Sequence, residues 1–356
     1  MRQFAVRTDS WSIAIAIALA MLTAGCGGGG AVDADALSGR ADIETAALAM
    51  SADLDDRFSI DHGRRILKAM ASDLEDVLRD TPTPEARIAR MANWLFNTKN
   101  LYSWVPKEDR WRGSTLGQVI DYHRGDCVAL SLLYLSLADR LDLPLRLVTM
   151  PGHALVAWVD GDGSARFYIE TTRSEPVRPS LAYLDDRLGT ERTGQRGAFH
   201  GRALSKREAV GVAMQQWGVG LMEQGRHREA EARFERAIAI NPDDASNHYH
   251  LARLMEKTGR LAKAEAQFAR AAQKNPRFAD AFVRRAIVLM ELDRYAHAAD
   301  SAQSAVALAP DDPSLRLLYA RLLTRAGRPE EAEVQLREAQ RLADELKARI
   351  DAMRGE

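Results

Sequence analysis

The spacing of apolar positions in the first half of the chain predicts helices. Between residues 63 and 78 apolar side chains recur at four-residue steps, which places them on one helical face. They are Ile66, Met70, Leu74 and Leu78. A second helix is predicted after Thr83, because a threonine followed by proline and an acid is typical of a helix start. The stretches 115–123 and 127–141 predict two more helices, and the last is apolar enough for the core.

Beyond Pro144 the helical spacing gives way to short apolar runs, which predict strands. The runs cover 145–150, 154–159 and 166–171, and an Asp-Gly-Asp-Gly turn sequence separates the last two. Residues 173–206 are rich in Arg, Gly, Pro and Ser without a clear period, so we interpret them as irregular connection. Helices followed by a small group of strands predict an α+β domain.

From about residue 209 the sequence repeats every 34 residues. Proline recurs in register at Pro242, Pro276 and Pro310. Alanine recurs at two further places, at Ala230, Ala264, Ala298 and Ala332, and at Ala237, Ala271, Ala305 and Ala339. Small residues allow two helices to pack closely, and proline ends a helix. The pattern resembles the tetratricopeptide repeat, and this resemblance implies an all-α solenoid of four repeats.

The resemblance also implies a concave groove that binds extended or helical peptides. In this family the groove is lined by particular positions of the first helix of each repeat. Those positions fall here on Gln215, Tyr249, Arg253, Val283, Ile287, Leu317 and Arg321. Solvated surface charge explains the two arginines equally well. A protein or peptide partner in the groove is the partner that the resemblance implies.

The first residues have the features of an export signal. Arg2 and Arg7 precede an apolar run from Trp11 to Leu22, and small residues lead from there to Cys26. The run is shorter than the roughly 20 apolar residues of a spanning helix. The end of the leader resembles the bacterial lipobox, which implies a lipid anchor at Cys26 in the cell envelope. Glycine rather than aspartate after the cysteine favours the outer membrane, facing the periplasm. An ordinary secreted protein with a stray cysteine is the alternative.

These patterns divide the chain into six stretches. They are a lipoprotein signal peptide (1–25), a lipid-anchored linker that becomes helical (26–59), an α+β domain (60–175), a connector (176–208), four repeats (209–344) and the end of a capping helix (345–356). The 49 Lys and Arg residues nearly balance 50 Asp and Glu residues. Nucleic acid is therefore not expected as a partner. His248 and His250 diverge on a helix, and no phosphate-binding glycine loop is present, so we expect no metal and no cofactor.

Cys127 is the candidate nucleophile. It begins the predicted helix 127–141, where free backbone N–H groups and the positive end of the helix dipole favour a thiolate and stabilise an oxyanion. His153, at the start of a predicted strand, is the candidate general base. A hairpin centred between residues 161 and 162 places Glu170 opposite His153, where it can orient the ring. Centring the hairpin one residue earlier or later gives Tyr168 or Thr172 instead, on the same face, but only Glu170 is an acid.

These residues resemble the transglutaminase-like superfamily, which shares the papain-type arrangement of cysteine, histidine and acid. The resemblance covers roughly residues 88 to 175. Its motifs are Gly125-Asp126-Cys127-Val128-Ala129-Leu130-Ser131, Leu143-Pro144-Leu145-Arg146-Leu147-Val148, Gly152-His153 and Ile169-Glu170-Thr171-Thr172. Glu170 stands where the superfamily usually has aspartate. We expect Asp126 to cap the helix rather than to act in catalysis.

The expected protein is thus an α+β transglutaminase-like, papain-like domain followed by an all-α tetratricopeptide-repeat solenoid. The first hypothesis is an envelope enzyme, a cysteine protease or a transglutaminase-like acyltransferase, in which Cys127 attacks a carbonyl, His153 moves the proton and Glu170 orients it. Peptide or amide hydrolysis and exchange of a glutamine amide share the acyl-enzyme. The second hypothesis is a catalytically inactive adaptor or assembly factor that recruits a periplasmic partner through its repeats. Cys127 would then be a buried small side chain and His153 an ordinary strand residue.

Overall fold

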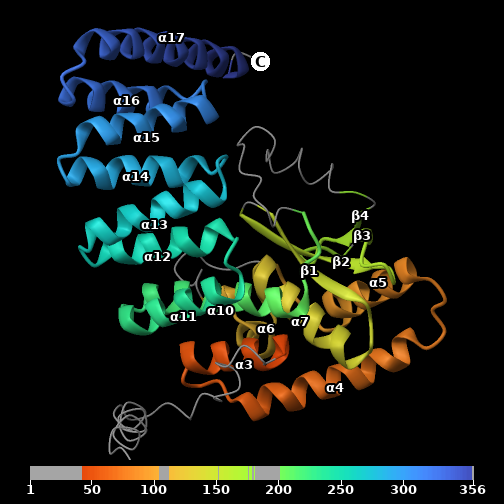
Figure 1. The fold of residues 1–356 in the computed structure, drawn as a ribbon. Coiled ribbons are helices and arrows are strands. Elements are labelled where there is room, and N and C mark those ends of the chain that lie inside the picture. Colours follow the sequence, from red (N-terminus) through yellow and green to blue (C-terminus); the bar gives the residue numbers. More distant parts are fainter. Residues whose placement is uncertain are drawn as a thin grey trace, which may run out of the picture.

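The computed structural model describes residues 42–103, 112–150, 152–174, 176–178, 180 and 201–354. A group of helices with a small sheet forms one part, and a stack of helices rises from it (Figure 1). Within the described ranges no helix is long and apolar enough to cross a bilayer. The predicted signal peptide and the lipid anchor at Cys26 lie outside the described residues and stay predictions.

Helices build most of the first part, and their starts follow the predicted signals. In chain order they are α3 (Ile43–Leu54), α4 (Ile60–Leu78), α5 (Pro84–Asn93), the π-helical η1 (Trp94–Thr98), the 3-10 turn η3 (Arg112–Ser114), α6 (Leu116–Tyr122) and α7 (Cys127–Arg140). The hydroxyl of Thr83 accepts the N–H of Ala86 at 3.3 Å and caps α5. Buried Leu67, Leu74 and Leu78 line the inner face of α4. The predicted helices are therefore confirmed.

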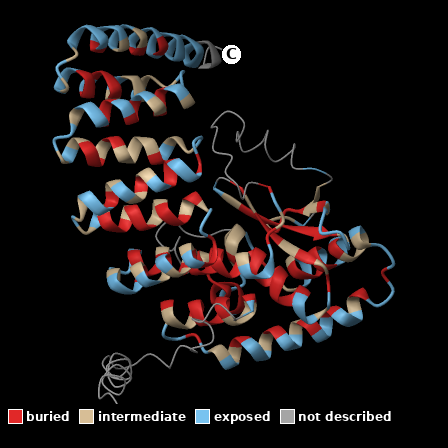
Figure 2. Ribbon diagram, in the orientation of Figure 1, coloured by how far each residue is buried: buried red, intermediate tan, exposed pale blue. Residues whose placement is uncertain are grey.

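Helix α3 is the helical end expected for the linker over residues 26–59, but it corrects the predicted start of the folded region near Ile60. Its residues from Ala46 to Met50 are all fully buried, so the folded core starts well before Ile60. Figure 2 shows α3 among the buried elements at the base of the helix stack. An amphipathic helix reveals itself by alternating apolar and polar faces, whereas a helix buried nearly all round has no such alternation. The weak periodicity of this Ala-rich stretch therefore concealed a core helix.

The sheet contains β1 (Leu145–Met150), β2 (His153–Val159), β3 (Ala165–Ile169) and β4 (Val177–Arg178), antiparallel and in that order. Val156 pairs with Ile169 and Trp158 with Phe167, and an irregularity shifts the register between Trp158 and Val159. This register belongs to a hairpin centred between residues 162 and 163. Extended along the strands, it brings Thr172 rather than Glu170 opposite His153, so the predicted register was wrong by one turn position.

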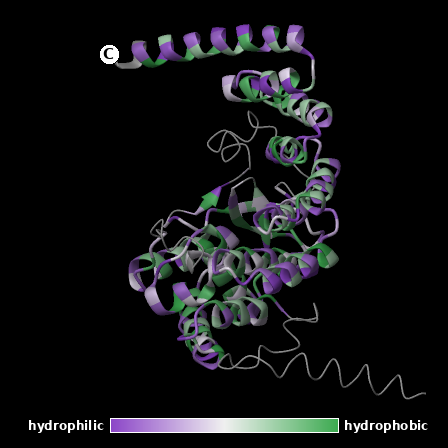
Figure 3. Cartoon of the chain, turned by 90° about the vertical axis from the view of Figure 1, so that its left-hand side faces the viewer, coloured by the Kyte–Doolittle hydropathy of each residue, from purple (hydrophilic) through white to green (hydrophobic). Residues whose placement is uncertain are grey.

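The repeats form pairs of antiparallel helices. They are α10 (Lys206–Glu223), α11 (His227–Ile240), α12 (Ala245–Lys257), α13 (Leu261–Lys274), α14 (Ala279–Glu291), α15 (Tyr295–Leu308), α16 (Pro313–Arg325) and α17 (Pro329–Arg354). The recurring alanines are buried between them, as their spacing predicts. Figure 3 shows the array rising along one side of the first part, with α17 running back above it.

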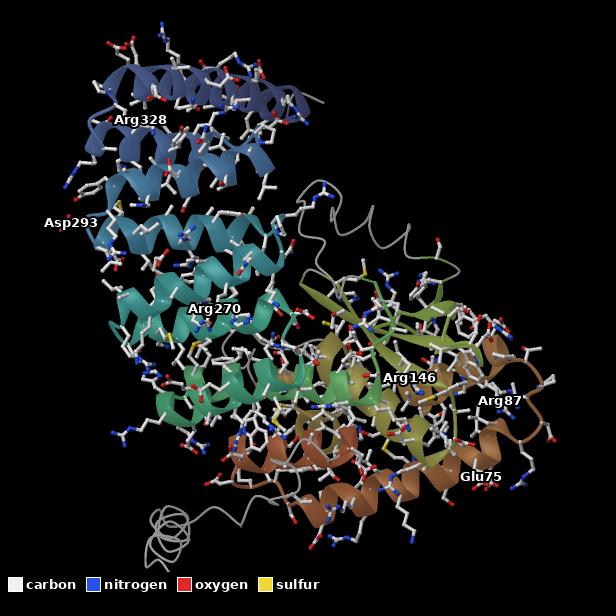
Figure 4. The ribbon with its side chains drawn as sticks, in the orientation of Figure 1. Glu75, Arg87, Arg146, Arg270, Asp293 and Arg328 are labelled. Carbon is white, nitrogen blue, oxygen red and sulfur yellow. The ribbon has the colours of Figure 1, made fainter. Side chains whose placement is uncertain are left out.

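The turns inside the repeats share one backbone conformation. Gly225, Gly259 and Gly327 have φ of 77°, 73° and 76°, and Asp293 takes the same place in the third repeat with φ of 57°. Glycine suits this left-handed region because it lacks a Cβ atom. Asp293 and Arg328 mark two of these turns along one edge of the array (Figure 4). The third repeat thus keeps the turn without the residue that favours it.

The first repeat packs directly against α3. Asp53 accepts hydrogen bonds from Nε1 of Trp217 and from Nη2 of Arg226, each at 2.6 Å. A Cβ atom on Gly220 would lie 2.7 Å from Cδ1 of Leu54, so α10 and α3 approach too closely there for a side chain. One apolar cluster consequently runs from α3 through the sheet into the repeats, whereas the later repeats also have a cluster of their own.

The predicted connector over 176–208 is corrected at its end. The N–H of Gly201 donates to the carbonyl of Thr149 at 3.0 Å, and the N–H of Leu204 donates to that of Leu147 at 2.8 Å. Residues 201–204 thereby extend the sheet beyond β1, and Leu204 is fully buried. Because α10 begins two residues later, the chain passes from sheet to array without a free linker.

Candidate active site

The start of α7 is fixed by Asp126. Its Oδ1 accepts the N–H groups of Val128 at 2.9 Å and Ala129 at 3.0 Å, and its carbonyl accepts that of Leu130 at 3.0 Å. The hydroxyl of Ser114 donates to the other carboxylate oxygen. Asp126 is therefore a helix cap, as predicted. The cap takes three N–H groups of the first turn and does not take that of Cys127.

The loop before Cys127 is held tightly against its surroundings. A Cβ atom on Gly125 would lie 2.7 Å from Cγ2 of Val119 and 3.0 Å from Cβ of Ala129, so this position requires glycine. The N–H of Gly125 donates to the carbonyl of Tyr102 at 3.1 Å. Cys127 itself is partly buried and has a free thiol. These contacts place the thiol at a defined point at the N-terminus of α7.

His153 and Glu170 form a largely buried pair. Nε2 of His153 lies 3.0 Å from Oε2 and 3.2 Å from Oε1 of Glu170, and the two side chains are 14% and 7% exposed. The hydroxyl of Thr172 donates to Oε1 at 2.6 Å. The predicted proximity of Glu170 to His153 is confirmed, although Glu170 reaches the ring diagonally. Its hydrogen bond with Thr172 was not predicted.

The charges of this pair favour each other. Burial lowers the pKa of His153, but hydrogen bonds with Cys127 and Glu170 outweigh it and raise this pKa to about 10. Burial raises the pKa of Glu170, but the hydrogen bonds from His153 and Thr172 hold this pKa below its usual value. The imidazolium and the carboxylate are therefore the forms present at neutral pH.

The three predicted side chains converge. His153 is hydrogen-bonded with Glu170, and Cys127 lies close enough to the same ring to help raise its pKa. Because Glu170 takes Nε2, Nδ1 is the ring nitrogen left for the thiol. The nucleophile comes from α7, the histidine from the start of β2 and the acid from the residue after β3. A thiol, a proton carrier and an orienting acid in series can perform nucleophilic catalysis at a carbonyl.

The seven predicted groove residues do not all lie on an open surface. Gln215 is only 5% exposed, and its Nε2 donates to Oγ of Ser246 at 2.7 Å and to Oδ1 of Asn247 at 2.8 Å. It joins α10 to α12, which corrects its assignment to the groove. Four of the others are partly buried, namely Tyr249, Arg253, Val283 and Ile287. Leu317, at 51%, and Arg321 are exposed.

The described part of the chain has few features suited to a metal ion or a small ligand. No group of three or more His, Cys, Asp or Glu side chains there is arranged to hold a metal ion. A polar pocket of about 400 Å³ lies beside the C-terminal end of α3, lined by residues 53–57 and Gln224. Its aspartates include Asp53, which is already bound to Trp217 and Arg226. The pocket is therefore part of the joint between α3 and the first repeat.

Two protein-family models match different parts of the chain. Residues 61–183 match the model of the transglutaminase-like superfamily, and residues 221–285 and 289–355 match the tetratricopeptide repeat. The chain joins a transglutaminase-like domain to tetratricopeptide repeats. The predicted fold class and resemblance are both confirmed. The repeats of the second region support binding of a protein or peptide.

Solved structures resemble only part of the chain. The crystal structure of MamA has 17% sequence identity and a TM-score of 0.36, and the match covers 39% of this chain and 81% of that one. YrrB, described as a TPR protein with an unusual peptide-binding site, has 20% identity and a TM-score of 0.35, over 37% of this chain and 68% of that one. No curated protein sequence matches the chain.

Proposed function

We propose that the transglutaminase-like domain is an enzyme of cysteine-dependent acyl transfer. The observation that supports this is the convergence of Cys127, His153 and Glu170, in which the ring of His153 is hydrogen-bonded with Glu170 and its pKa responds to both neighbours. The raised pKa of His153, about 10, favours an imidazolium beside the sulfur at neutral pH. A cation in that place stabilises a thiolate, which is the reactive form of cysteine.

The reaction follows from these charges. The thiolate of Cys127 attacks the carbonyl carbon of an amide, and the carbonyl electrons move onto oxygen. The N–H of Cys127, which the Asp126 cap does not take, is suited to stabilise this oxyanion. His153 gives its proton to the leaving amine as the C–N bond breaks, leaving a thioester. Water or a second amine then attacks the thioester, His153 takes up the incoming proton, and the C–S bond breaks to return the thiolate of Cys127 beside the imidazolium.

Alkylation of Cys127 by iodoacetamide tests the nucleophile and its base. The full chain is labelled, and mass spectrometry measures the adduct on the peptide that contains Cys127. His153→Ala should slow alkylation about tenfold or more near pH 6 and much less near pH 9, where a thiol ionises without help. Glu170→Gln should give an intermediate loss.

Another histidine of the chain provides a matched control. His62 also faces an acid, with Nε2 lying 3.2 Å from Oδ1 of Asp121, but it belongs to α4 and its pair is more exposed. His62→Ala should leave the alkylation profile unchanged. Equal rates for the parent and His153→Ala over the whole pH range would reject the enzyme and favour an inactive adaptor. A hydroxamate formed from a glutamine peptide and hydroxylamine would identify the acyl product.

We further propose that the repeats bind an acidic, partly apolar peptide. Arg253 and Arg321 form no ion pair or hydrogen bond with any residue that the structure describes, and they occupy equivalent places in the second and fourth repeats. Ile287 occupies that place between them, and Tyr249, Val283 and Leu317 form a parallel apolar row. Unpaired arginines beside apolar side chains match carboxylates and apolar groups on a partner.

Binding of labelled peptides tests this preference. A peptide of alternating glutamate and leucine should bind more tightly than one with lysine in place of glutamate. Arg253→Ala with Arg321→Ala should weaken binding by about tenfold and reduce its salt dependence. Arg270→Ala on α13 is the matched control, because Arg270 is exposed on a second helix of a repeat (Figure 4). Equal loss in the control would contradict a groove-specific contact.

The anchor is the third part of the proposal. The basic residues, the apolar run and the lipobox-like end of the leader support lipidation at Cys26 and a place at the envelope, facing the periplasm. Cys26→Ser should release the protein into the soluble fraction. Continued partition of this variant with membranes would contradict the lipid anchor.

A further inference from the structure

A buried pair of hydroxyl groups joins α7, which carries Cys127, to the turn that carries Glu170. Oγ of Ser131 lies 3.1 Å from Oγ1 of Thr171, and both residues are fully buried. Ser131 is on α7, one turn after Cys127, and Thr171 directly follows Glu170. The hydrogen bond therefore spans the two ends of the series that passes through His153.

The place of Glu170 is not set by the sheet alone. β3 ends at Ile169, so Glu170 belongs to the turn that follows it. Its N–H donates to the carbonyl of Pro176 at 2.8 Å, and the hydroxyl of Thr172 holds its carboxylate. Both of these partners are on the same turn. The bond between Ser131 and Thr171 ties this turn directly to α7.

We propose that Ser131 and Thr171 are a positioning pair, which sets the distance between the thiol of Cys127 and the carboxylate of Glu170. This inference rests on the proposed acyl-transfer function. In the proposed reaction His153 must reach both groups at once, so a small displacement of either end separates the ring from the thiol or from the carboxylate. Misplacement of about 1 Å can cost a catalytic site two orders of magnitude in rate.

Another serine of α7 has a buried hydroxyl that bonds only inside its own helix, as far as the structure describes it. Ser136 is also fully buried, and its Oγ donates to the carbonyl of Leu132 in the same helix at 2.8 Å. It makes a bond of the kind that serine commonly makes inside helices. Ser131 instead bonds to a residue outside the helix, and this difference makes Ser136 a matched control.

The test measures the titration of the His153 ring by NMR in the full chain, because this readout does not depend on turnover. The ring signal is assigned by its loss in His153→Ala. Ser131→Ala and Thr171→Val should each shift the titration midpoint toward the ordinary value of histidine, since the ring is no longer held between thiol and carboxylate. Thr171→Ser keeps the hydroxyl and should keep the parent midpoint, and Ser136→Ala should also leave it unchanged.

The double variant separates positioning from general loss of packing. Because both single changes break one bond, the double variant should shift the midpoint no further than either does. Alkylation of Cys127 near pH 6 should slow about threefold to tenfold in the single variants and not in Ser136→Ala. Thermal unfolding checks that each variant is folded. If Ser131→Ala does not fold, Thr171→Val tests the same hydrogen bond.

Two outcomes would overturn the positioning pair. One is an unchanged His153 midpoint in both folded variants, and the other is an equal shift in Ser136→Ala. Failure of the proposed enzyme gives a different result, namely alkylation that does not depend on His153 although its midpoint still responds to Ser131. The two proposals are thus rejected by separate measurements.

Discussion

The first and last repeats share a sequence pattern but have different surroundings. In α10, twelve of 18 residues are buried, because α3 covers the side that no earlier repeat occupies. In α17 the side chains of Leu346, at 48% exposure, and Ile350 stand open. A repeat buries its apolar faces only against its neighbours. The comparison teaches that the first repeat has a neighbour from outside the array, so the border seen in the sequence does not separate two cores.

The joint between α3 and the first repeat is also polar. The carboxylate of Asp53 lies between Trp217 and Arg226, and the ring of Trp217 is covered by the guanidinium of Arg233 at 4.0 Å. A buried carboxylate is tolerated when its oxygens are satisfied in this way. The joint therefore has a specific geometry in addition to its apolar contacts.

Removal of α3 should have the largest effect. Deleting residues 42–59 uncovers α10, and we expect the transglutaminase-like domain and the first repeat to lose cooperative folding, because total stabilities are only about 5–15 kcal/mol. Deleting residues 345–356 should change the urea midpoint little. Circular dichroism during urea unfolding measures both deletions, and in a fragment that starts near Leu204 fluorescence reports Trp217 alone. A fragment starting near Leu204 that unfolds cooperatively with Trp217 buried would show that the first repeat does not need α3.

Removal of Asp53 should have a smaller effect at the same joint. Asp53→Ala leaves Nε1 of Trp217 and the Arg226 guanidinium without this partner, and we expect a loss of about 2–4 kcal/mol in the free energy of unfolding. The matched change in the last repeat is Asp344→Ala, which removes a carboxylate that accepts a hydrogen bond from Gln340 of the same helix at 2.9 Å. It should have little effect. Equal losses in urea unfolding would contradict the distinction between the two ends.

The pH dependence of stability should give the smallest effect. The folded pKa of His153, about 10, lies above its ordinary 6.5, so its contribution is complete below about pH 6.5 and is lost as pH rises toward 10. The pKa of Glu170 lies below 4.5, so its contribution is present above about pH 4.5 and is lost as pH falls. We expect a decline of about 1 kcal/mol between pH 6.5 and pH 7.5, where the histidine of the unfolded chain loses its proton while the folded His153 keeps it.

His153→Ala is the variant that assigns this decline. It should remove the alkaline loss of stability from the unfolding transition followed by tryptophan fluorescence, which does not report the later repeats because no tryptophan follows Trp217 in the chain. An alkaline decline that persists in His153→Ala would assign it to other groups.

Features that depend on residues close together in the sequence could be predicted. Features that depend on contacts between distant residues could not. The 34-residue period identified the array, and Cys127 and His153 were found because each stands at the start of a predicted element. Among Tyr168, Glu170 and Thr172, Glu170 was selected because it is the only acid. Glu170 does contact His153, although the predicted strand register was wrong. The strand register shifts between Trp158 and Val159, and the residues of the turn gave no sign of this shift.

The parts that were missed depend on partners far away in the chain. Helix α3 has no polar stripe because it is covered on nearly every side. Asp53 and Trp217 are 164 residues apart, and Ser131 and Thr171 are 40 apart. Gln215 was assigned by its place in the repeat, but α12 supplies hydrogen bonds that turn it inward. Periodicity indicates which residues face a neighbour and leaves open what that neighbour is.

The uncovered face of α17 makes the array extensible at one end only. Leu336, Leu346 and Ile350 present apolar side chains on a helix to which a further repeat can be joined in protein engineering. At the opposite end the equivalent side of α10 is occupied by α3, so an inserted repeat would have to displace a core helix of the transglutaminase-like domain. The architecture can lengthen its binding surface outward while the geometry at Cys127 stays the same.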